Sequence, residues 1–261
     1  MKYSEEEIRI INLFNEIKNN DKELMYNGRA YKVLLADKPS YSSCGEGKTD
    51  IYLLLNDGIN NCEIKCSSKM SNAEFLENKL KADRAEAIFG QDWPKILNEY
   101  TSSLKDKFES LELYNEEKNS CTLGFRTDIT TKPRTLAKEF IPSPQEKREI
   151  LLGQKLHKSK CNVKVGGTLI ENAGVATHIL LNSEHYKDAQ SILNNLLIPE
   201  EVELKCYITF CAVNYFIDTD KYESRWLGVN IDWSSGEPNI IYDEPLKHTA
   251  KEMRDIVKEC L

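Results

Sequence analysis

The amino-acid sequence predicts a mixed α/β fold in which a central β-sheet is flanked by helices. Strand-like runs rich in β-branched and aromatic residues alternate with helical segments along the chain. Several helical segments open with a capping box, and one Asp-Gly pair joins two strand-like runs as a hairpin. The 261 residues contain no internal repeat and no long linker rich in glycine, serine or proline. We therefore expect one compact unit that spans residues 1–261.

The first predicted elements are a helix and three strands. Ser4 and Glu7 form a capping box that predicts a helix over about residues 5–19. Asp57-Gly58 separates the second and third strand-like runs, which predicts a hairpin with a two-residue turn. The three strands are expected over residues 30–36, 49–56 and 61–67.

The rest of the chain is expected to alternate between helices and strands. Capping boxes that begin at Ser71 and Ser143 predict two helices, and Asp92-Trp93-Pro94 predicts another. The polar residues 114–133 are expected to be irregular. The helices are expected over residues 71–89, 93–111, 143–156, 184–197 and 243–260, and further strands over residues 162–170, 176–181, 205–217 and 226–231.

Charge is distributed unevenly along the chain, which has a net charge of -7. Residues 132–165 contain nine Lys or Arg and three Asp or Glu residues, whereas the segments on both sides are acidic. Such a stretch is typical of a surface that contacts phosphate backbones, and also of a solvated helix face. The side chains expected to contact duplex DNA are Lys132, Arg134, Lys155, Lys158, Lys160 and Lys164, with His157 and Asn162 near base edges.

Several classes of protein are disfavoured by composition. The eight cysteines form no CxxC pair, and neither they nor the four histidines have the spacing of a metal site. The N-terminus lacks the basic and then apolar pattern of a signal peptide, and no apolar run approaches the roughly 20 residues that cross a bilayer. We expect a cytoplasmic protein with reduced cysteines and no membrane association.

The segment Gly47-Lys48-Thr49 raises a choice between nucleotide binding and metal-dependent catalysis. A P-loop needs a glycine five positions before Gly47 and a helix directly after Thr49. Ser42 occupies the glycine position, and the residues after Thr49 have a strand pattern. The segment therefore fits a P-loop poorly, and nucleotide binding stays as an alternative.

Asp50, Glu63 and Lys65 are the candidate catalytic residues. Side chains two positions apart on a strand share a face, so Glu63 and Lys65 point the same way and Ile64 points into the core. With the expected two-residue turn, the residue numbers of two paired residues on the two strands add up to an odd number. Paired residues share a face, so Asp50 lies on the face of Glu63 and Lys65. We expect the three side chains to converge.

The residue types fit magnesium-dependent hydrolysis of a phosphodiester. The carboxylates of Asp50 and Glu63, with the main-chain carbonyl of Ile64, offer the hard oxygen ligands that Mg²⁺ prefers. The ion stabilises charge on the phosphate and activates a bound water, and Lys65 orients the water or offsets charge. Charged residues also occupy the solvated face of many antiparallel strands, so the triplet alone is not decisive.

The stretch GKTDIYLLL, followed by CEIKCSSK, resembles the PD-(D/E)xK nuclease motif, and more narrowly that of small type II restriction endonucleases. The match covers Gly47 to Lys69, with Thr49 in place of the leading proline. The resemblance implies a restriction-endonuclease-like core, with Asp50 and Glu63 as Mg²⁺ ligands and Lys65 as the catalytic lysine. It also suggests phosphate contacts by Lys48, Ser67, Ser68 and Lys69, and an acidic residue of the first helix, Glu7 or Glu16, near the metal.

The function expected from the resemblance is cleavage of double-stranded DNA at a short specific sequence. The nuclease core is expected over about residues 1–112 and a DNA-recognition part over about 113–261, in a monomer or homodimer. A cognate DNA methyltransferase is expected in the same cell, without forming a stable subunit. A repair or recombination nuclease of the same fold, and a non-catalytic DNA- or protein-binding module, stay as alternatives.

Overall fold

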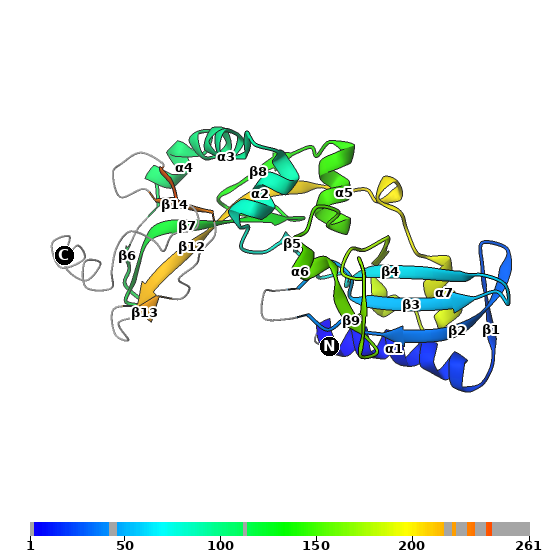
Figure 1. The fold of residues 1–261 in the computed structure, drawn as a ribbon. Helices are drawn as coiled ribbons and strands as arrows, with labels where there is room; N and C mark the ends of the chain where they lie inside the picture. Colours follow the sequence, from blue (N-terminus) through cyan, green and yellow to red (C-terminus); the bar gives the residue numbers. More distant parts are fainter. Residues whose placement is uncertain are drawn as a thin grey trace. The chain divides into compact units, whose positions relative to one another are not determined.

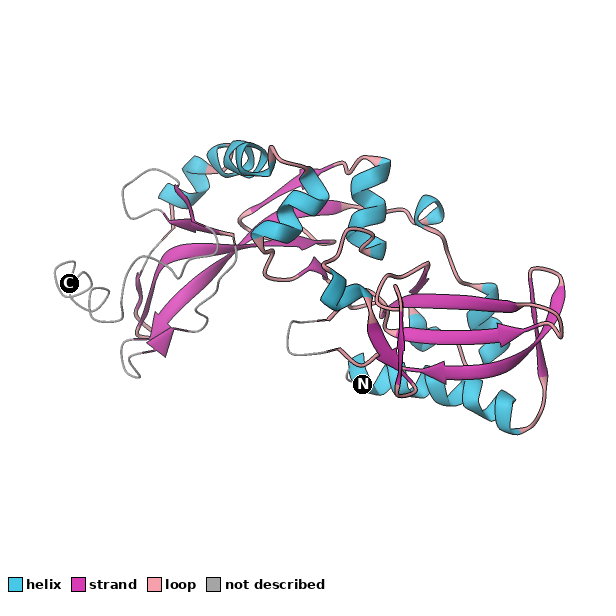
Figure 2. Cartoon of the chain, in the orientation of Figure 1, coloured by secondary structure: helices cyan, strands magenta, loops and turns pink. Residues whose placement is uncertain are grey.

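The fold was analysed in a computed structural model that describes residues 3–41, 46–111, 114–216, 221–222, 229–232 and 239–241. The helix expected over 243–260 and the first half of the strand expected over 226–231 lie outside the described residues. Figures 1 and 2 show a mixed α/β protein, the class that the sequence predicts.

The chain divides into two compact units, whereas the sequence suggested a single unit with a core ending near residue 112. Unit 1 comprises Met1–Ala73 and Ser143–Glu203, and unit 2 comprises Glu74–Pro142 and Leu204–Leu261. The division differs because β4 of unit 1 pairs with β11, which follows more than a hundred residues later. Unit 2 begins within that long connection.

Unit 1 is built on a five-stranded mixed sheet with the order β1-β2-β3-β4-β11. The first four strands are antiparallel to their neighbours, and β11 is parallel to β4. The strands are β1 (Glu23–Tyr26), β2 (Arg29–Asp37), β3 (Ile51–Asn56), β4 (Asn61–Lys69) and β11 (His178–Leu181). The predicted strands in this region are therefore confirmed, and β1 is an additional one.

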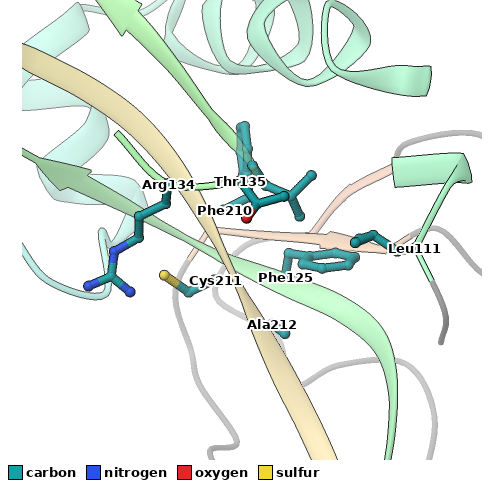
Figure 3. A pocket seen from close by; sticks show the side chains of 8 residues that line it. Leu111, Phe125, Arg134, Thr135, Phe210, Cys211 and Ala212 are labelled. Carbon is teal, nitrogen blue, oxygen red and sulfur yellow. The ribbon is translucent and has the colours of Figure 1, made fainter. Parts of the chain in front are cut away.

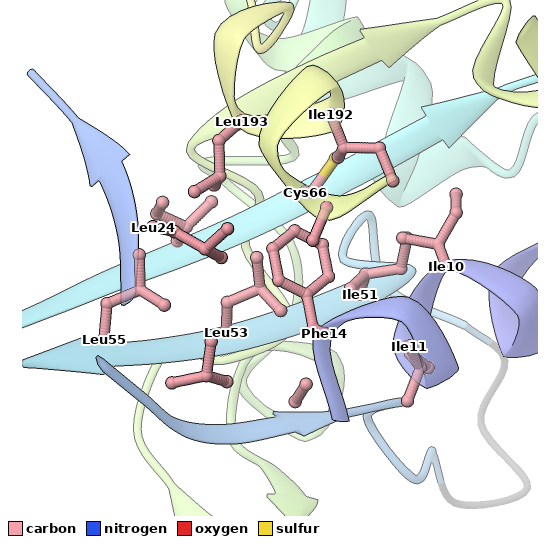
Figure 4. Packing of buried hydrophobic residues seen from close by; sticks show 14 of the residues in the cluster. Ile10, Ile11, Phe14, Leu24, Ile51, Leu53, Leu55, Cys66, Ile192 and Leu193 are labelled. Carbon is pink, nitrogen blue, oxygen red and sulfur yellow. The ribbon is translucent and has the colours of Figure 1, made fainter. Parts of the chain in front are cut away.

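One face of this sheet packs against helices. Ile51, Leu53 and Leu55 alternate along β3 and join Phe14 of α1 (Tyr3–Asn19) in a buried cluster (Figure 4). The helix α7 (Ala189–Asn194) contributes Ile192 and Leu193 to the same cluster. Because apolar side chains recur on one face of α1 and at every second position of β3, both elements bury that face together.

The opposite face of the sheet is covered by a small hairpin. It consists of β9 (Val163–Val165) and β10 (Thr168–Ile170), joined by Gly166-Gly167, which both have positive φ. Val163 and Val165 pack on Tyr52 of β3. Burial on both faces explains why β3 reads as an almost continuous apolar run.

The remaining elements of unit 1 are short helices that connect the sheet strands. Ser143 and Glu146 form the predicted capping box at the start of α5, and Gly153 ends that helix with a φ of +70°. The elements are α5 (Pro144–Leu152), α6 (Lys158–Cys161), η1 (Ser183–His185) and η2 (Pro199–Glu201).

Unit 2 is organised around two long antiparallel strands, β7 (Ser120–Thr130) and β12 (Cys206–Phe216). Shorter strands extend this pair: β5 (Phe75–Glu77), β6 (Tyr114–Asn115), β8 (Ala137–Phe140), β13 (Lys221–Tyr222), β14 (Asn230–Asp232) and β15 (Asn239–Ile241). The helices are α2 (Ala82–Phe89), α3 (Trp93–Ser102) and α4 (Lys105–Glu109).

Two sequence predictions for unit 2 are wrong. The segment 114–133 was expected to be irregular, yet most of it forms β6 and β7, because the register with β12 gives its polar residues strand partners. The helix expected from Ser71 starts only at Ala82, since residues 75–77 pair with β7 and Glu74 binds Lys132 and Arg134. Both outcomes depend on contacts between distant segments.

Within the described residues, no helix is both long enough and apolar enough to span a bilayer.

The packing of α1 on β3 predicts a large cost for the Phe14→Ala substitution. The Phe14 side chain is completely buried, and removal of a buried ring costs about 3–5 kcal/mol. Urea-induced unfolding should show this loss, whereas Ile8→Ala on the exposed face of α1, where Ile8 is 54% exposed, should change stability by less than about 0.5 kcal/mol. Equal effects of the two substitutions would contradict the packing described for α1.

Candidate functional site

The turn between β3 and β4 is longer than the sequence suggested. Asn56 pairs with Asn61, so four residues form the turn instead of two. The Asp57 carboxylate accepts hydrogen bonds from the N–H groups of Ile59 and Asn60, and the Asn56 side chain accepts one from Gly58. These local bonds stabilise the wider turn, because Asn and Asp side chains readily bind main-chain N–H groups two residues ahead.

The wider turn moves the register by two residues and keeps its parity. Tyr52 pairs with Lys65 and Leu54 pairs with Glu63, so the residue numbers of each pair add up to an odd number, as predicted. Asp50 therefore shares a face with Glu63 and Lys65. Its partner position is Ser67, however, and not Lys65.

The register separates the two predicted carboxylates. The Ser67 and Glu63 positions are four residues apart on β4, which is about 13 Å along the strand at ~3.3 Å per residue. Lys65 is the diagonal neighbour of Asp50, a geometry that brings Cα atoms to about 7–8 Å. The expected convergence of Asp50 with Glu63 is thus replaced by a row of side chains along one face.

Asp50 is positioned at the start of β3 by bonds to the end of β4. Its N–H donates to the carbonyl of Cys66 at 2.9 Å. Its carboxylate accepts a 2.8 Å hydrogen bond from the N–H of Ser68 and a 3.4 Å one from the hydroxyl of Ser67. Ser67 and Ser68, predicted to bind phosphate, therefore orient Asp50 in this structure.

Glu7 of α1 lies in the electrostatic environment of Asp50. Its side chain is only 14% exposed and binds the ammonium group of Lys38 at 2.5 Å. Burial raises the pKa of the Glu7 carboxyl, Lys38 opposes that shift, and the negative charges of Asp50 and Glu46 add to it. Of the two first-helix candidates, the structure brings Glu7 near Asp50, whereas Glu16 lies nine residues further along α1 on an exposed position.

Glu63 and Lys65 form a second group on the same face. The Lys65 Nζ lies 3.9 Å from the Glu63 carboxylate and donates a 3.1 Å hydrogen bond to the carbonyl of Asn172. Tyr52 donates its hydroxyl proton to Glu63, and both burial and that bond raise the Tyr52 pKa well above its usual value. Ile64 between them is fully buried in the core, as predicted.

Hydrogen bonds connect the main chain of Lys65 to His178 on β11. The Thr177 hydroxyl accepts the N–H of Lys65 at 3.0 Å and contacts its carbonyl at 3.2 Å. His178 contacts Thr177 through Nδ1 at 2.9 Å and the Tyr26 hydroxyl through Nε2 at 3.1 Å. One assignment satisfies all four bonds: Tyr26 donates to Nε2, Nδ1–H donates to Thr177, and Thr177 donates to Lys65.

The Gly47-Lys48-Thr49 segment is held by main-chain groups of the protein. The N–H groups of Lys48 and Thr49 donate to the carbonyl of Gly174 at 2.8 and 3.3 Å. The structure continues after Thr49 into strand β3 and not into a helix. These N–H groups are therefore engaged in the fold, in contrast to those of a phosphate-binding loop.

The basic residues predicted to contact DNA fall into two groups. Arg134 and Lys132 of unit 2 form ion pairs with Glu74, and Arg134 also lies over the ring of Phe75. In Figure 3 the Arg134 side chain extends away from Phe125, at the edge of a cavity of about 520 Å³. The other group lies in unit 1, where Lys155, Lys158 and Lys164 are exposed and Lys48, Lys69 and Lys160 are half-buried.

His157 and Asn162, expected near base edges, have structural roles. His157 is the N-cap of α6 and accepts the N–H of Ser159. Asn162 accepts the N–H of Asn172, a residue with a φ of +55° whose carbonyl binds Lys65. Asn162 therefore shapes the segment that contacts Lys65, and His157 shapes the start of α6.

The sequence did not identify Tyr52, Asn172 or Thr177 as neighbours of the candidate residues. Tyr52 could have been found, since it lies on the predicted face between Asp50 and Leu54. Asn172 and Thr177 approach Lys65 from more than a hundred residues away, which no local pattern reveals. Among the described residues, no group of three or more His, Cys, Asp or Glu side chains is close enough to hold a metal ion.

A scan against protein-family models finds no match to the chain, and searches for similar curated proteins and similar solved structures find none either.

The close approach of Gly174 to α6 predicts a strong effect of Gly174→Ala. An added Cβ would lie 1.8 Å from the main-chain carbonyl oxygen of Lys160, so the main chain has to move. We expect a loss of about 3 kcal/mol or more in the free energy of unfolding. Gly28→Ala is the matched control: its Cβ meets no atom within 4 Å but its φ is +76°, which costs only about 1 kcal/mol. Similar losses for the two variants would contradict the contact.

The environment of His178 predicts a pH dependence of stability. Burial lowers the pKa of His178, and Glu201 only partly opposes this effect, so the folded state favours the neutral ring. The contribution of His178 to the free energy of unfolding is fully present above about pH 6.5, the pKa of histidine in the unfolded chain. It is lost as the pH falls from there toward the lower pKa of His178 in the folded state. Urea unfolding between pH 7.5 and 5 should be less sensitive to acid in His178→Gln than in His185→Gln; equal sensitivity would contradict the prediction.

Proposed function

We propose that the chain is a magnesium-dependent deoxyribonuclease that cleaves double-stranded DNA at a short specific sequence, as type II restriction endonucleases do. The observation that carries the proposal is that Asp50, Glu63 and Lys65 share one face of the paired strands β3 and β4. Their motif resembles that of the PD-(D/E)xK nucleases over Gly47 to Lys69. The mixed sheet flanked by helices is compatible with a core of that kind.

The residues fit a magnesium ion at Asp50 better than at Glu63. Ligand oxygens lie 2.0–2.1 Å from Mg²⁺. Glu63 is about 13 Å along β4 from Ser67, the residue opposite Asp50, so Asp50 and Glu63 do not fit the same ion. The second carboxylate in this proposal is that of Glu7, which is mostly buried, lies within the field of the Asp50 charge and would exchange its ion pair with Lys38 for the metal ion. The hydroxyl of Thr49, next to Asp50, is buried and has no hydrogen-bond partner among the described residues. We therefore assign Asp50 and Glu7 as the protein ligands.

Each of the remaining residues has a defined role in this proposal. When bound, the ion neutralises charge on the phosphate and lowers the pKa of its water. Lys65 supplies a positive charge toward the scissile phosphate, after exchanging the carbonyl of Asn172 for that ligand. Glu63 orients the Lys65 side chain through their ion pair, and Tyr52 in turn fixes Glu63 through its hydroxyl. Ser67 and Ser68 fix the Asp50 carboxylate.

Contacts with the DNA backbone are assigned to the basic residues of unit 1. Exposed and half-buried lysines release counterions when they bind phosphates, which supplies affinity without sequence preference. The residues proposed for this role are Lys48, Lys69, Lys155, Lys158, Lys160 and Lys164. Arg134 is a weaker candidate, because binding DNA requires it to leave Glu74. Sequence recognition is assigned to residues outside the nuclease motif.

A non-catalytic DNA-binding module is the second candidate function. The specific observation in its favour is the separation of Asp50 from Glu63, since the two do not form the joint carboxylate site that the motif implies. Such a protein would bind duplex DNA through the same lysines and leave it intact. Cleavage therefore distinguishes the two candidates.

We expect magnesium-dependent cleavage of a long unmodified duplex of mixed sequence into discrete fragments. EDTA should abolish the fragments, and Asp50→Asn or Lys65→Ala should slow their formation by about a hundredfold or more, because each removes a charge that acts on the reacting phosphate. Gel analysis of the products over time measures the rate. Lys22→Ala, an exposed lysine near the start of β1, is the control and should cleave normally.

A matched pair of helix variants tests the assignment of Glu7. Glu7→Gln should reduce cleavage strongly, and Glu16→Gln on the same helix should leave it unchanged. Intact DNA with every version of the protein, on several unmodified substrates, would favour the binding module. Equal cleavage by wild-type protein and Lys65→Ala would contradict the proposed site.

A further inference from the structure

A cavity of about 470 Å³ opens in unit 1, and none of the residues that line it belongs to the nuclease motif. It is formed by the end of the β1–β2 hairpin, the first residue of β11, the last turn of α7 and η2. The lining residues are Tyr26, Asn27, His178, Leu193, Asn194, Leu196, Ile198 and Glu201. A volume of this size is sufficient for a small organic molecule.

The lining is mainly polar and has a smaller apolar part. Tyr26 and His178 are half-buried and hydrogen-bonded to each other, which fixes both rings. Leu193 is buried, and Leu196 is half-buried. Asn27, Asn194 and Glu201 are exposed and lie around them. The cavity therefore has fixed inner rings with polar groups nearer to solvent.

The charges of the lining favour a cation. Glu201 is the only residue of the lining with a formal charge, and neither lysine nor arginine lines the cavity. The field of its carboxylate reaches His178, where it favours the protonated ring, although burial has the larger effect and lowers the pKa. The imidazole is therefore neutral near pH 7, and the cavity as a whole is negative. An anionic ligand would find no counter-charge here.

We propose that this cavity binds a small organic cation with an ammonium group on an aliphatic chain. An ammonium group has three hydrogen-bond donors and no acceptor, and so matches the Glu201 carboxylate and the carboxamide oxygens of Asn27 and Asn194. The ring of Tyr26 offers a cation–π contact. The side chains of Leu196 and Ile198 pack against the methylene groups.

The inference goes beyond the proposed nuclease and does not depend on it, because no residue of the cavity belongs to the motif. His178 provides a direct reporter, since its ring is part of the inner wall. A ligand that enters the cavity changes the surroundings of that ring, whether or not the protein cleaves DNA.

The test is a titration of the protein with 1,4-diaminobutane, followed by the NMR signals of the His178 ring, which the His178→Gln variant identifies. We expect a saturable shift in the wild-type protein. Glu201→Gln should weaken binding roughly fivefold to tenfold, because a charge-assisted hydrogen bond at an exposed position is partly screened by solvent. Glu203→Gln removes the same charge two residues away and should leave the affinity unchanged.

Three controls make the result decisive. Circular dichroism of each variant confirms that unit 1 remains folded. 1,4-Butanediol, which has the same chain without charge, should bind at least tenfold more weakly, and succinate should not shift the His178 signals. No saturable shift with the diamine, an equal response to the diol, or equal losses in the two glutamate variants would overturn the proposal.

Discussion

The pairing of β3 with β4 determines which side chains can act together. Its register is set by the four-residue turn, in which Asn56 and Asp57 bind main-chain N–H groups, and by the bond from the Asp50 N–H to the Cys66 carbonyl. A shift by one residue would move Lys65 to the helix-covered face and expose Ile64. The complete burial of Ile64 beneath α1 therefore excludes that shift. The turn selects one register among those that differ by two residues and keep Ile64 on the buried face.

Burial on both faces turns this strand pair into a rigid support. Helices α1 and α7 cover one face, and the β9–β10 hairpin covers Tyr52 on the other. The main chain at Gly174 fits against Lys160 and accepts the N–H groups of Lys48 and Thr49. The segment before Asp50 is thereby held by residues far along the chain. Rigid placement of this kind is what a catalytic carboxylate requires, since misplacement by about 1 Å is costly to a reaction.

Local sequence patterns predicted the parts of the structure that depend on local interactions. The first helix, the hairpin strands and the face shared by Asp50 and Lys65 follow from periodicity, and the start of α5 follows from the capping box at Ser143. The capping box predicted at Ser4 is wrong, because α1 already includes Tyr3 and the Glu7 carboxylate binds Lys38. The turn length was wrong because side-chain bonds of Asn56 and Asp57 outweighed the Asp-Gly preference for a tight turn. Strand β7 and the proximity of Glu7 to Asp50 depend on partners distant in sequence, and no local pattern encodes them.

The central claim is that a magnesium ion binds between Asp50 and Glu7, and not between Asp50 and Glu63. Calorimetric titration with Mg²⁺ at neutral pH, in the presence of duplex DNA and with Lys65→Ala as the background to prevent turnover, tests it directly. The account predicts that adding Glu7→Gln weakens Mg²⁺ binding by about tenfold or more, because one of two carboxylate ligands is lost. Glu63→Gln should leave the affinity nearly unchanged. Loss of binding in Glu63→Gln with normal binding in Glu7→Gln, or no Mg²⁺ binding in the background protein, would contradict the account.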